Sequence, residues 1–308
     1  MPTLKEIKGR IGSVKSTLKI TSAMKLVSSA KLRKAQNAIE AMRPYEETLQ
    51  GMLSAVGGSC APEALSAHRT AAADPAWAQE ASGAHRPAAI VAIASNSSLC
   101  GGFNANVIAK VRSVRQPGDI VFSVGRKMAD AMRRDGFLTP EDLNALIERP
   151  AYGPSAALVE KLAKEVEEGR YARVLLVYTH FVSTARQVPV VELLLGEIPG
   201  QAGNDAQSVL PGNDHSVMPD SDRASDGILI ESGRHELLQE LLPKTLKLKL
   251  YAALLDSSAA EHAARTVAMQ TATDNAENLL SELTLQYNKG RQQKITSEIL
   301  DLAGGQTE

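Results

Sequence analysis

Residues 4–27 read LKEIKGRIGSVKSTLKITSAMKLV, a segment that indicates a long amphipathic helix. Its apolar residues recur at spacings of three and four, and after Leu18 the pattern continues with a phase step. No proline interrupts it before Pro44. A helix of about 50 residues would reach roughly 75 Å, which exceeds the width of a domain of this size. The segment therefore predicts a rod that cannot be buried inside its own chain. The apolar positions are Leu4, Ile7, Ile11, Val14, Leu18, Ile20, Met24 and Val27.

The other end of the chain predicts a second long helix. It begins after Ser232-Gly233 and runs to about Leu302, just ahead of Gly304-Gly305. Between two leucine-rich stretches, residues 257–276 are rich in Ala and Ser, which would let another helix approach closely. The first helix is its natural partner. We therefore predict a long antiparallel α-helical coiled coil formed by residues 1–56 and residues 228–308.

The middle of the chain, residues 88–198, predicts an α/β domain. Apolar runs typical of buried strands alternate with helical patterns, which favours a small, mostly parallel, Rossmann-like open sheet. Two further segments are predicted to be surface loops: residues 57–87, which are rich in Ala, and residues 199–227, which are acidic and contain Pro and Gly. The expected strands are 88–94, 119–125, 173–178 and 187–193, and the expected helices are 105–114, 127–135 and 155–168.

Composition excludes several classes of protein. The 308 residues carry a net charge of −1, which argues against a globally basic nucleic-acid coat. No apolar run reaches the roughly 18 residues of a membrane span, and charged residues near the start argue against a secretory signal. Two cysteines, Cys60 and Cys100, are too few for a disulfide framework and indicate a reducing cytoplasmic setting. Aromatic residues make up only 4% of the chain, and the first 44 residues contain none.

The segment SNSSLCGGFN, residues 95–104, follows a predicted strand and opens a predicted helix. Ligand loops of α/β proteins occupy such places. The segment lacks the spacing of a dinucleotide fingerprint or a phosphate-binding loop, so a structural turn is favoured. Cys100 has no His close in sequence to act as its base, so a buried thiol is favoured over a nucleophile. A small-molecule enzyme using the Cys100-Gly101-Gly102 loop stays open as the alternative function.

The remaining candidate sites are weaker. Gly125-Arg126-Lys127 could hold an anion at a helix N-terminus, although a solvated helix start is favoured. Glu261 and Arg265 are four residues apart on the second long helix and predict a surface ion pair worth a few tenths of a kcal/mol. The histidines are not grouped at metal-ligand spacings. We therefore expect neither a catalytic site nor a cofactor or metal.

Positive charge gathers on the first helix. Residues 1–56 hold 10 Lys and Arg against 4 Asp and Glu. Such a helix could follow a phosphate backbone, present a solvated coiled-coil face, or meet an acidic protein surface. Charge alone leaves these three readings open.

Several motifs remain to be explained. Near the start stand KITSAMKLV at 19–27 and KLRKAQ at 31–36, and near the end stand EHAARTVAM at 261–269 and YNKGRQQKITSEI at 287–299. Between them lie LCGGFN at 99–104, GRK at 125–127 and YTHFVS at 178–183. In this order the motifs closely resemble the gamma subunit of F-type rotary ATP synthases. The resemblance spans nearly the whole chain apart from the two loops.

The resemblance implies a non-catalytic rotor subunit without a cofactor. In that family the coiled coil stands inside a ring of three alpha and three beta subunits, and the α/β domain contacts the c-subunit ring and the epsilon subunit. Rotation of the shaft couples proton movement to ATP synthesis or hydrolysis in the beta subunits. The implied location is peripheral, at the cytoplasmic face of an energy-transducing membrane. An acidic protein collar, rather than phosphate, is then the expected partner of the basic helix.

The resemblance also implies functional residues. Five positions match residues that affect coupling between rotor and catalytic ring, and two more are expected to face acidic surfaces of beta subunits. The chain departs from the family where Asn96-Ser97-Ser98 replaces Asp-Arg-Gly, where Gln270 replaces Lys and where Ala260 replaces Ser. The close cysteine pair of the redox-regulated chloroplast forms is missing. The coupling positions are Met24, Lys25, Arg265, Gln292 and Thr296, and the beta-facing positions are Lys31 and Arg33.

Overall fold

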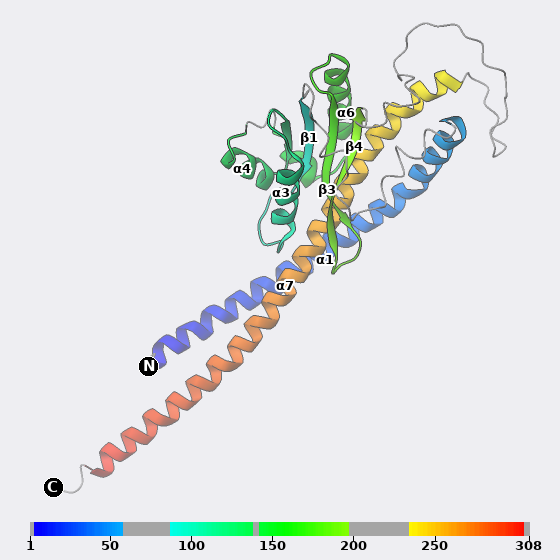
Figure 1. Cartoon of the computed structure of the whole chain (residues 1–308). Coiled ribbons are helices and arrows are strands. Elements are labelled where there is room, and N and C mark those ends of the chain that lie inside the picture. Colours follow the sequence, from blue (N-terminus) through cyan, green and yellow to red (C-terminus); the bar gives the residue numbers. More distant parts are fainter. Residues whose placement is uncertain (1–2, 58–86, 138–141, 197–233, 305–308) are drawn as a thin grey trace.

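A computed structural model describes residues 3–57, 87–137, 142–196 and 234–304. The two predicted loops and Cys60 lie almost wholly outside these residues. The described chain forms a two-helix rod and an α/β domain that sits beside it (Figure 1). The predicted fold class is thereby confirmed.

Helices α1 (Leu4–Gly57, 54 residues) and α7 (Arg234–Gly304, 71 residues) form the rod. The start of α1 is a capping box, because the Thr3 hydroxyl accepts from the Glu6 amide while the Glu6 carboxylate accepts from the Thr3 amide. Pro44 and Pro243 both lie within the continuous helices. The predicted second helix is thus confirmed, with ends that differ from the prediction by about one turn or less.

The two helices pack antiparallel along most of α1. Leu32 and Ala35 of α1 form a buried cluster with Ala259 and Ala263 of α7. Further along, a Cβ atom added at Gly290 would lie 3.2 Å from Leu4, so the start of α1 lies beside that glycine. Small side chains on α7 therefore allow the close helix packing that the sequence predicted. At the other end of the pair, Leu49, Leu53, Leu241 and Leu248 form a second buried cluster.

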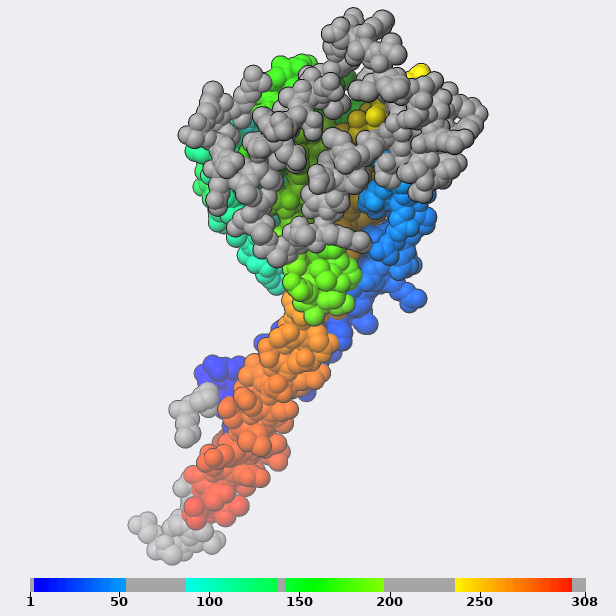
Figure 2. All heavy atoms as spheres, turned by 45° about the vertical axis from the view of Figure 1, so that its right-hand side comes forward, coloured from blue at the N-terminus to red at the C-terminus, as the bar shows by residue number. Residues whose placement is uncertain are grey.

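The last part of α7 extends beyond the start of α1 as a single helix. Residues 291–300 are all exposed, and the start of α1 lies well short of the end of α7 along the rod (Figures 1 and 2). The roughly 14 residues past Gly290 would extend about 20 Å. The rod therefore changes from two helices to one toward its tip.

The α/β domain contains a four-stranded sheet with strand order β2-β1-β3-β4. Three strands are parallel, and β4 (Gln187–Gly196) joins β3 in an antiparallel hairpin. The sheet is therefore open and mostly parallel, as predicted. The parallel strands are β1 (Ala88–Ile93), β2 (Ile120–Val124) and β3 (Arg173–Phe181).

Both faces of the sheet are covered. Helices α3 (Phe103–Val114) and α4 (Arg126–Arg134) bury one face. The other face packs against α5 (Asn144–Glu148), α6 (Tyr152–Glu167) and the rod helix α7. Leu250 and Leu254 of α7 are fully buried in this second core. One helix therefore belongs to the rod and to the domain at once.

Candidate functional site

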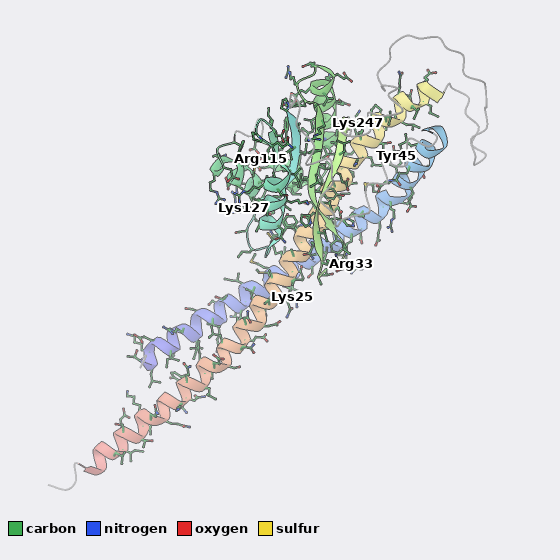
Figure 3. The ribbon with its side chains drawn as sticks, in the orientation of Figure 1. Lys25, Arg33, Tyr45, Arg115, Lys127 and Lys247 are labelled. Atoms are coloured by element: carbon green, nitrogen blue, oxygen red, sulfur yellow. The ribbon has the colours of Figure 1, made fainter. Side chains whose placement is uncertain are left out.

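The four predicted residues on α1 lie along the rod. Met24 and Lys25 are half-buried, whereas Lys31 and Arg33 are exposed. Figure 3 shows Lys25 and Arg33 on the rod, apart from the labelled domain residues Arg115 and Lys127. Within the described residues, neither Lys31 nor Arg33 has a carboxylate within ion-pair distance. These two cations are therefore available to an acidic partner.

Arg265 lies inside the chain, which corrects the predicted surface pair. Its guanidinium donates to Glu261 over 2.7 Å, and both side chains are only 9% exposed. It also donates to the Ser97 hydroxyl over 2.8 Å. The spacing of the two residues predicts a solvent-exposed pair. In the structure, the loop between β1 and α3 covers the pair. Removing one partner of a buried ion pair strongly destabilises the fold, because the other charge stays buried without a counter-charge. Removing one partner of a surface pair has little effect.

Two neighbours complete this cluster. Burial raises the pKa of the Glu261 carboxyl, and the positive charges of Arg265 and Lys31 offset part of the rise. Burial and the same two cations lower the pKa of His262 to about 4. His262 is therefore neutral at neutral pH, and its Nδ1, 3.4 Å from Arg265, accepts because a guanidinium can only donate. Lys31 of α1 thus acts on the Glu261–Arg265 pair through its charge, from beyond ion-pair distance.

Gln292 and Thr296 lie far from this cluster, on the single-helix tip of α7. Both are exposed, and the Thr296 hydroxyl donates only along the helix, to the Gln292 carbonyl. Their exposed apolar neighbours Ile295, Ile299 and Leu300 are 46%, 59% and 65% exposed. The predicted coupling residues therefore fall into separate groups along the rod rather than into one site.

The Cys100-Gly101-Gly102 loop is a structural turn. Cys100 is 2% exposed, and the groups near its thiol are the side chains of Ser95 and Asn104 and the Ser97 carbonyl. None of these is a general base that could activate a thiol. A cavity of about 210 Å³ lies between this loop, the β3–β4 hairpin and α7. The loop therefore lacks the geometry of a nucleophilic site.

The N-terminus of α4 is also closed to ligands. The Arg126 amide donates to the Asn96 side chain, and the Lys127 amide donates to the Ser95 carbonyl. The amides that would hold an anion are therefore used inside the protein. The Arg126 side chain is exposed at this helix start. Asn96 also donates to Asn144 and Glu148, so it links three segments.

The comparisons with known proteins identify the family. The family model described as ATP synthase matches residues 3–307. The ATP synthase gamma chain of Phocaeicola vulgatus is 42% identical over 312 residues, covering 99% of both chains. The chain belongs to the ATP synthase gamma-chain family. The gamma chain of Bacteroides thetaiotaomicron is 41% identical, again over 99% of both chains.

Solved structures share the gamma-chain fold. A chain of the Euglena gracilis mitochondrial ATP synthase, in an assembly of OSCP, F1 and c-ring, aligns with a TM-score of 0.66 and 21% identity, covering 99% of this chain and 93% of that one. A rotor structure from the same organism aligns with a TM-score of 0.62 and 19% identity, covering 95% and 98%. Among the described residues, no helix meets the length and hydropathy of a membrane span, and no acidic, His or Cys cluster could hold a metal ion.

Sequence reasoning missed the contacts that join the two parts of this gamma-chain family member. Lys249 of α7 donates to the Leu193 carbonyl of β4 and lies 3.6 Å from the Glu192 carboxylate. Asp256 of α7 accepts from the Phe181 amide at the end of β3. The two α7 residues are seven apart, which places them on one side of the helix, but that spacing alone does not distinguish such contacts from a solvated face.

Proposed function

We propose that this chain is the central rotor subunit of an F-type ATP synthase and has no catalytic site of its own. Its coiled coil stands within the alpha and beta subunits, and its α/β domain meets the epsilon subunit and the c-subunit ring. Rotation of the rod couples proton movement to ATP synthesis or hydrolysis in the beta subunits. The complex holds the chain peripherally at the cytoplasmic face of the membrane.

The observation that carries this proposal is the rod itself. It extends beyond the α/β domain, and it is asymmetric along its length because α7 continues as a single helix past the start of α1 (Figure 2). A turning asymmetric rod presents different side chains to each surrounding subunit in turn. Each orientation then favours a different conformation of that subunit, which is differential binding.

The surface of the rod supports the same function. Apolar side chains remain exposed along α1, with Ile20, Leu26 and Val27 at 60%, 71% and 57% exposed. Isolated exposed apolar residues are ordinary, but these three lie between the exposed cations Lys19 and Lys31. We propose that this mixed surface contacts the catalytic ring, with Lys31 and Arg33 facing acidic patches.

Assembly tests the proposed function. We expect the purified chain alone to hydrolyse no ATP, and the chain mixed with alpha and beta subunits to copurify with them and to stimulate ATP turnover. Release of inorganic phosphate measures turnover in both samples. Robust hydrolysis by the isolated chain, or failure to copurify, would contradict the proposal.

The coupling residues are tested separately. Met24→Lys adds a long cation to a half-buried position on the rod surface, so we expect ATP hydrolysis to persist while ATP-driven proton pumping falls. Met24→Leu is the matched control, because it keeps the size and apolar character of the side chain. Both activities are measured in membrane vesicles that carry the assembled complex. Equal pumping per ATP for the two variants would contradict the proposed role of Met24.

A further inference from the structure

The guanidinium of Arg265 bonds to groups of its own chain. Its guanidinium meets Glu261 over 2.7 Å, the Ser97 hydroxyl over 2.8 Å and the Ser98 carbonyl at 3.5 Å. Only 7% of the residue is exposed. A side chain so enclosed cannot contact another subunit without first leaving these partners.

The cluster lies at one end of the joint between rod and domain. Toward the opposite end, Lys249 and Asp256 of α7 bond to backbone groups of β4 and β3. Between them, Leu250 and Leu254 are buried in the domain core. Past Ala268, α7 contacts α1: Thr273 donates to Thr21, and Gly290 lies beside Leu4. The Glu261–Arg265 pair therefore marks the place where the rod leaves the domain.

The loop between β1 and α3, which the Glu261–Arg265 pair contacts, contains residues in the left-handed backbone conformation. Leu99 has φ of 67°, a left-handed conformation that is uncommon for residues other than Gly, Asn and Asp. Gly101, with φ of 57°, lies against α7, where an added Cβ would be in ordinary contact with the Cβ of Ala268 at 3.8 Å. Such a backbone persists only where its surroundings hold it in place. Arg265 supplies two of those contacts.

We propose that Glu261 is a positioning residue that keeps Arg265 turned inward, and that the pair locks the loop between β1 and α3 onto α7 so that domain and rod turn as one body. This inference rests on the proposed rotor function. Arg265 then affects coupling from inside the rotor rather than by contacting the catalytic ring. Loss of the Glu261 charge would leave a buried cation without a counter-charge, so Arg265 would turn toward solvent and release the loop.

Coupling in the assembled complex tests the role of Glu261. The ratio of ATP-driven proton pumping to ATP hydrolysis is measured in membrane vesicles. We expect Glu261→Gln to lower this ratio several-fold. Glu240→Gln is the matched control, because Glu240 forms an exposed ion pair with Lys244 at the same spacing on the same helix. We expect the ratio for that variant to equal the wild-type value.

A reversible covalent bond tests the lock directly. The 3.8 Å separation at Gly101 and Ala268 suits a disulfide, so both are replaced by Cys in a chain that carries Cys60→Ala and Cys100→Ala. We expect oxidation to form the bond, to leave both activities of the otherwise wild-type rotor unchanged, and to restore the pumping ratio of Glu261→Gln. The same protein kept reduced is the control for the backbone change at Gly101.

The outcomes separate this inference from the proposed function. A wild-type complex that neither pumps nor hydrolyses would contradict the rotor function itself. With an active wild type, the lock is contradicted by an unchanged ratio in Glu261→Gln, by failure of the two cysteines to oxidise, or by an oxidised rotor that stops until reduced. An oxidised rotor that stops until it is reduced would mean that the joint between rod and domain opens in each cycle. The disulfide experiment on the otherwise wild-type rotor tests the lock even if Glu261→Gln fails to assemble.

Discussion

At Gly125 the chain passes from β2 into α4 with φ of 102°, and an added Cβ would lie 2.1 Å from the Ala94 carbonyl oxygen. Gly118 has a similar φ of 97° but nothing within 4 Å of the same position. We expect Gly125→Ala to lower the free energy of unfolding by on the order of 3 kcal/mol and Gly118→Ala by roughly 1 kcal/mol, because only the first adds a collision to the backbone strain. Urea unfolding of the two variants measures the difference, and equal losses would contradict the close packing at Gly125.

His262 makes stability depend on pH. Its pKa is about 4 in the folded chain and about 6.5 when unfolded, so the unfolded state binds more protons between these values. The contribution of His262 to stability is therefore present above about pH 6.5 and is lost as the pH falls toward 4. We expect the melting temperature of the wild type to fall more between pH 7.5 and pH 5 than that of His262→Gln, in which Glu261, Arg265 and Lys31 are unchanged. Parallel pH profiles would show that His262 is not held neutral.

At the scale of elements, a buried hydroxyl pair joins the two rod helices. Thr273 of α7 donates to Thr21 of α1 over 3.0 Å, and the Thr21 hydroxyl donates to the Leu18 carbonyl. We expect Thr273→Val or Thr21→Val alone to cost about 1 kcal/mol or more, because each leaves a buried hydroxyl with fewer partners. The double variant should cost less than the sum of the two, and urea unfolding of all four proteins measures this. Additive losses would mean that the hydroxyls do not interact across the helices.

Long elements were predictable from sequence, and short ones were not. Helices α1 and α7 repeat their apolar pattern over many turns, so periodicity identifies them. Helix α5 has only five residues, too few to show a period. Helix α6 begins at Tyr152, before the predicted start, because Gly153 and Pro154 fit its first turn although both usually mark a break.

The candidate site was predictable only in part, for a physical reason. The resemblance to gamma subunits identified Arg265, but the spacing of Glu261 and Arg265 describes a surface pair as well as a buried one. Its burial depends on a loop 168 residues away in sequence, which folds over the pair. Local patterns carry no information about such a contact, so the sequence predicts Glu261 in a surface pair with Arg265, whereas the pair is buried.

At the scale of the whole molecule, α7 unites the two parts. It contributes Leu250 and Leu254 to the core of the α/β domain and continues as the longer member of the rod. Helix α1 packs along α7, and residues 4–44, which contain no aromatic residue, present small and aliphatic side chains together with Lys and Arg. Torque applied to the domain therefore reaches the rod through one continuous helix, and the second helix stiffens it.

Rotation of this chain is the most direct measurement of the central claim. The chain is assembled with alpha and beta subunits fixed to a surface, and a bead is attached through a cysteine placed on the outer face of α4 at exposed Arg133. On addition of ATP, we expect the bead to turn continuously in one direction, at a rate that matches the measured hydrolysis. Hydrolysis by the same complexes with beads that only fluctuate about a fixed position would contradict the rotor function.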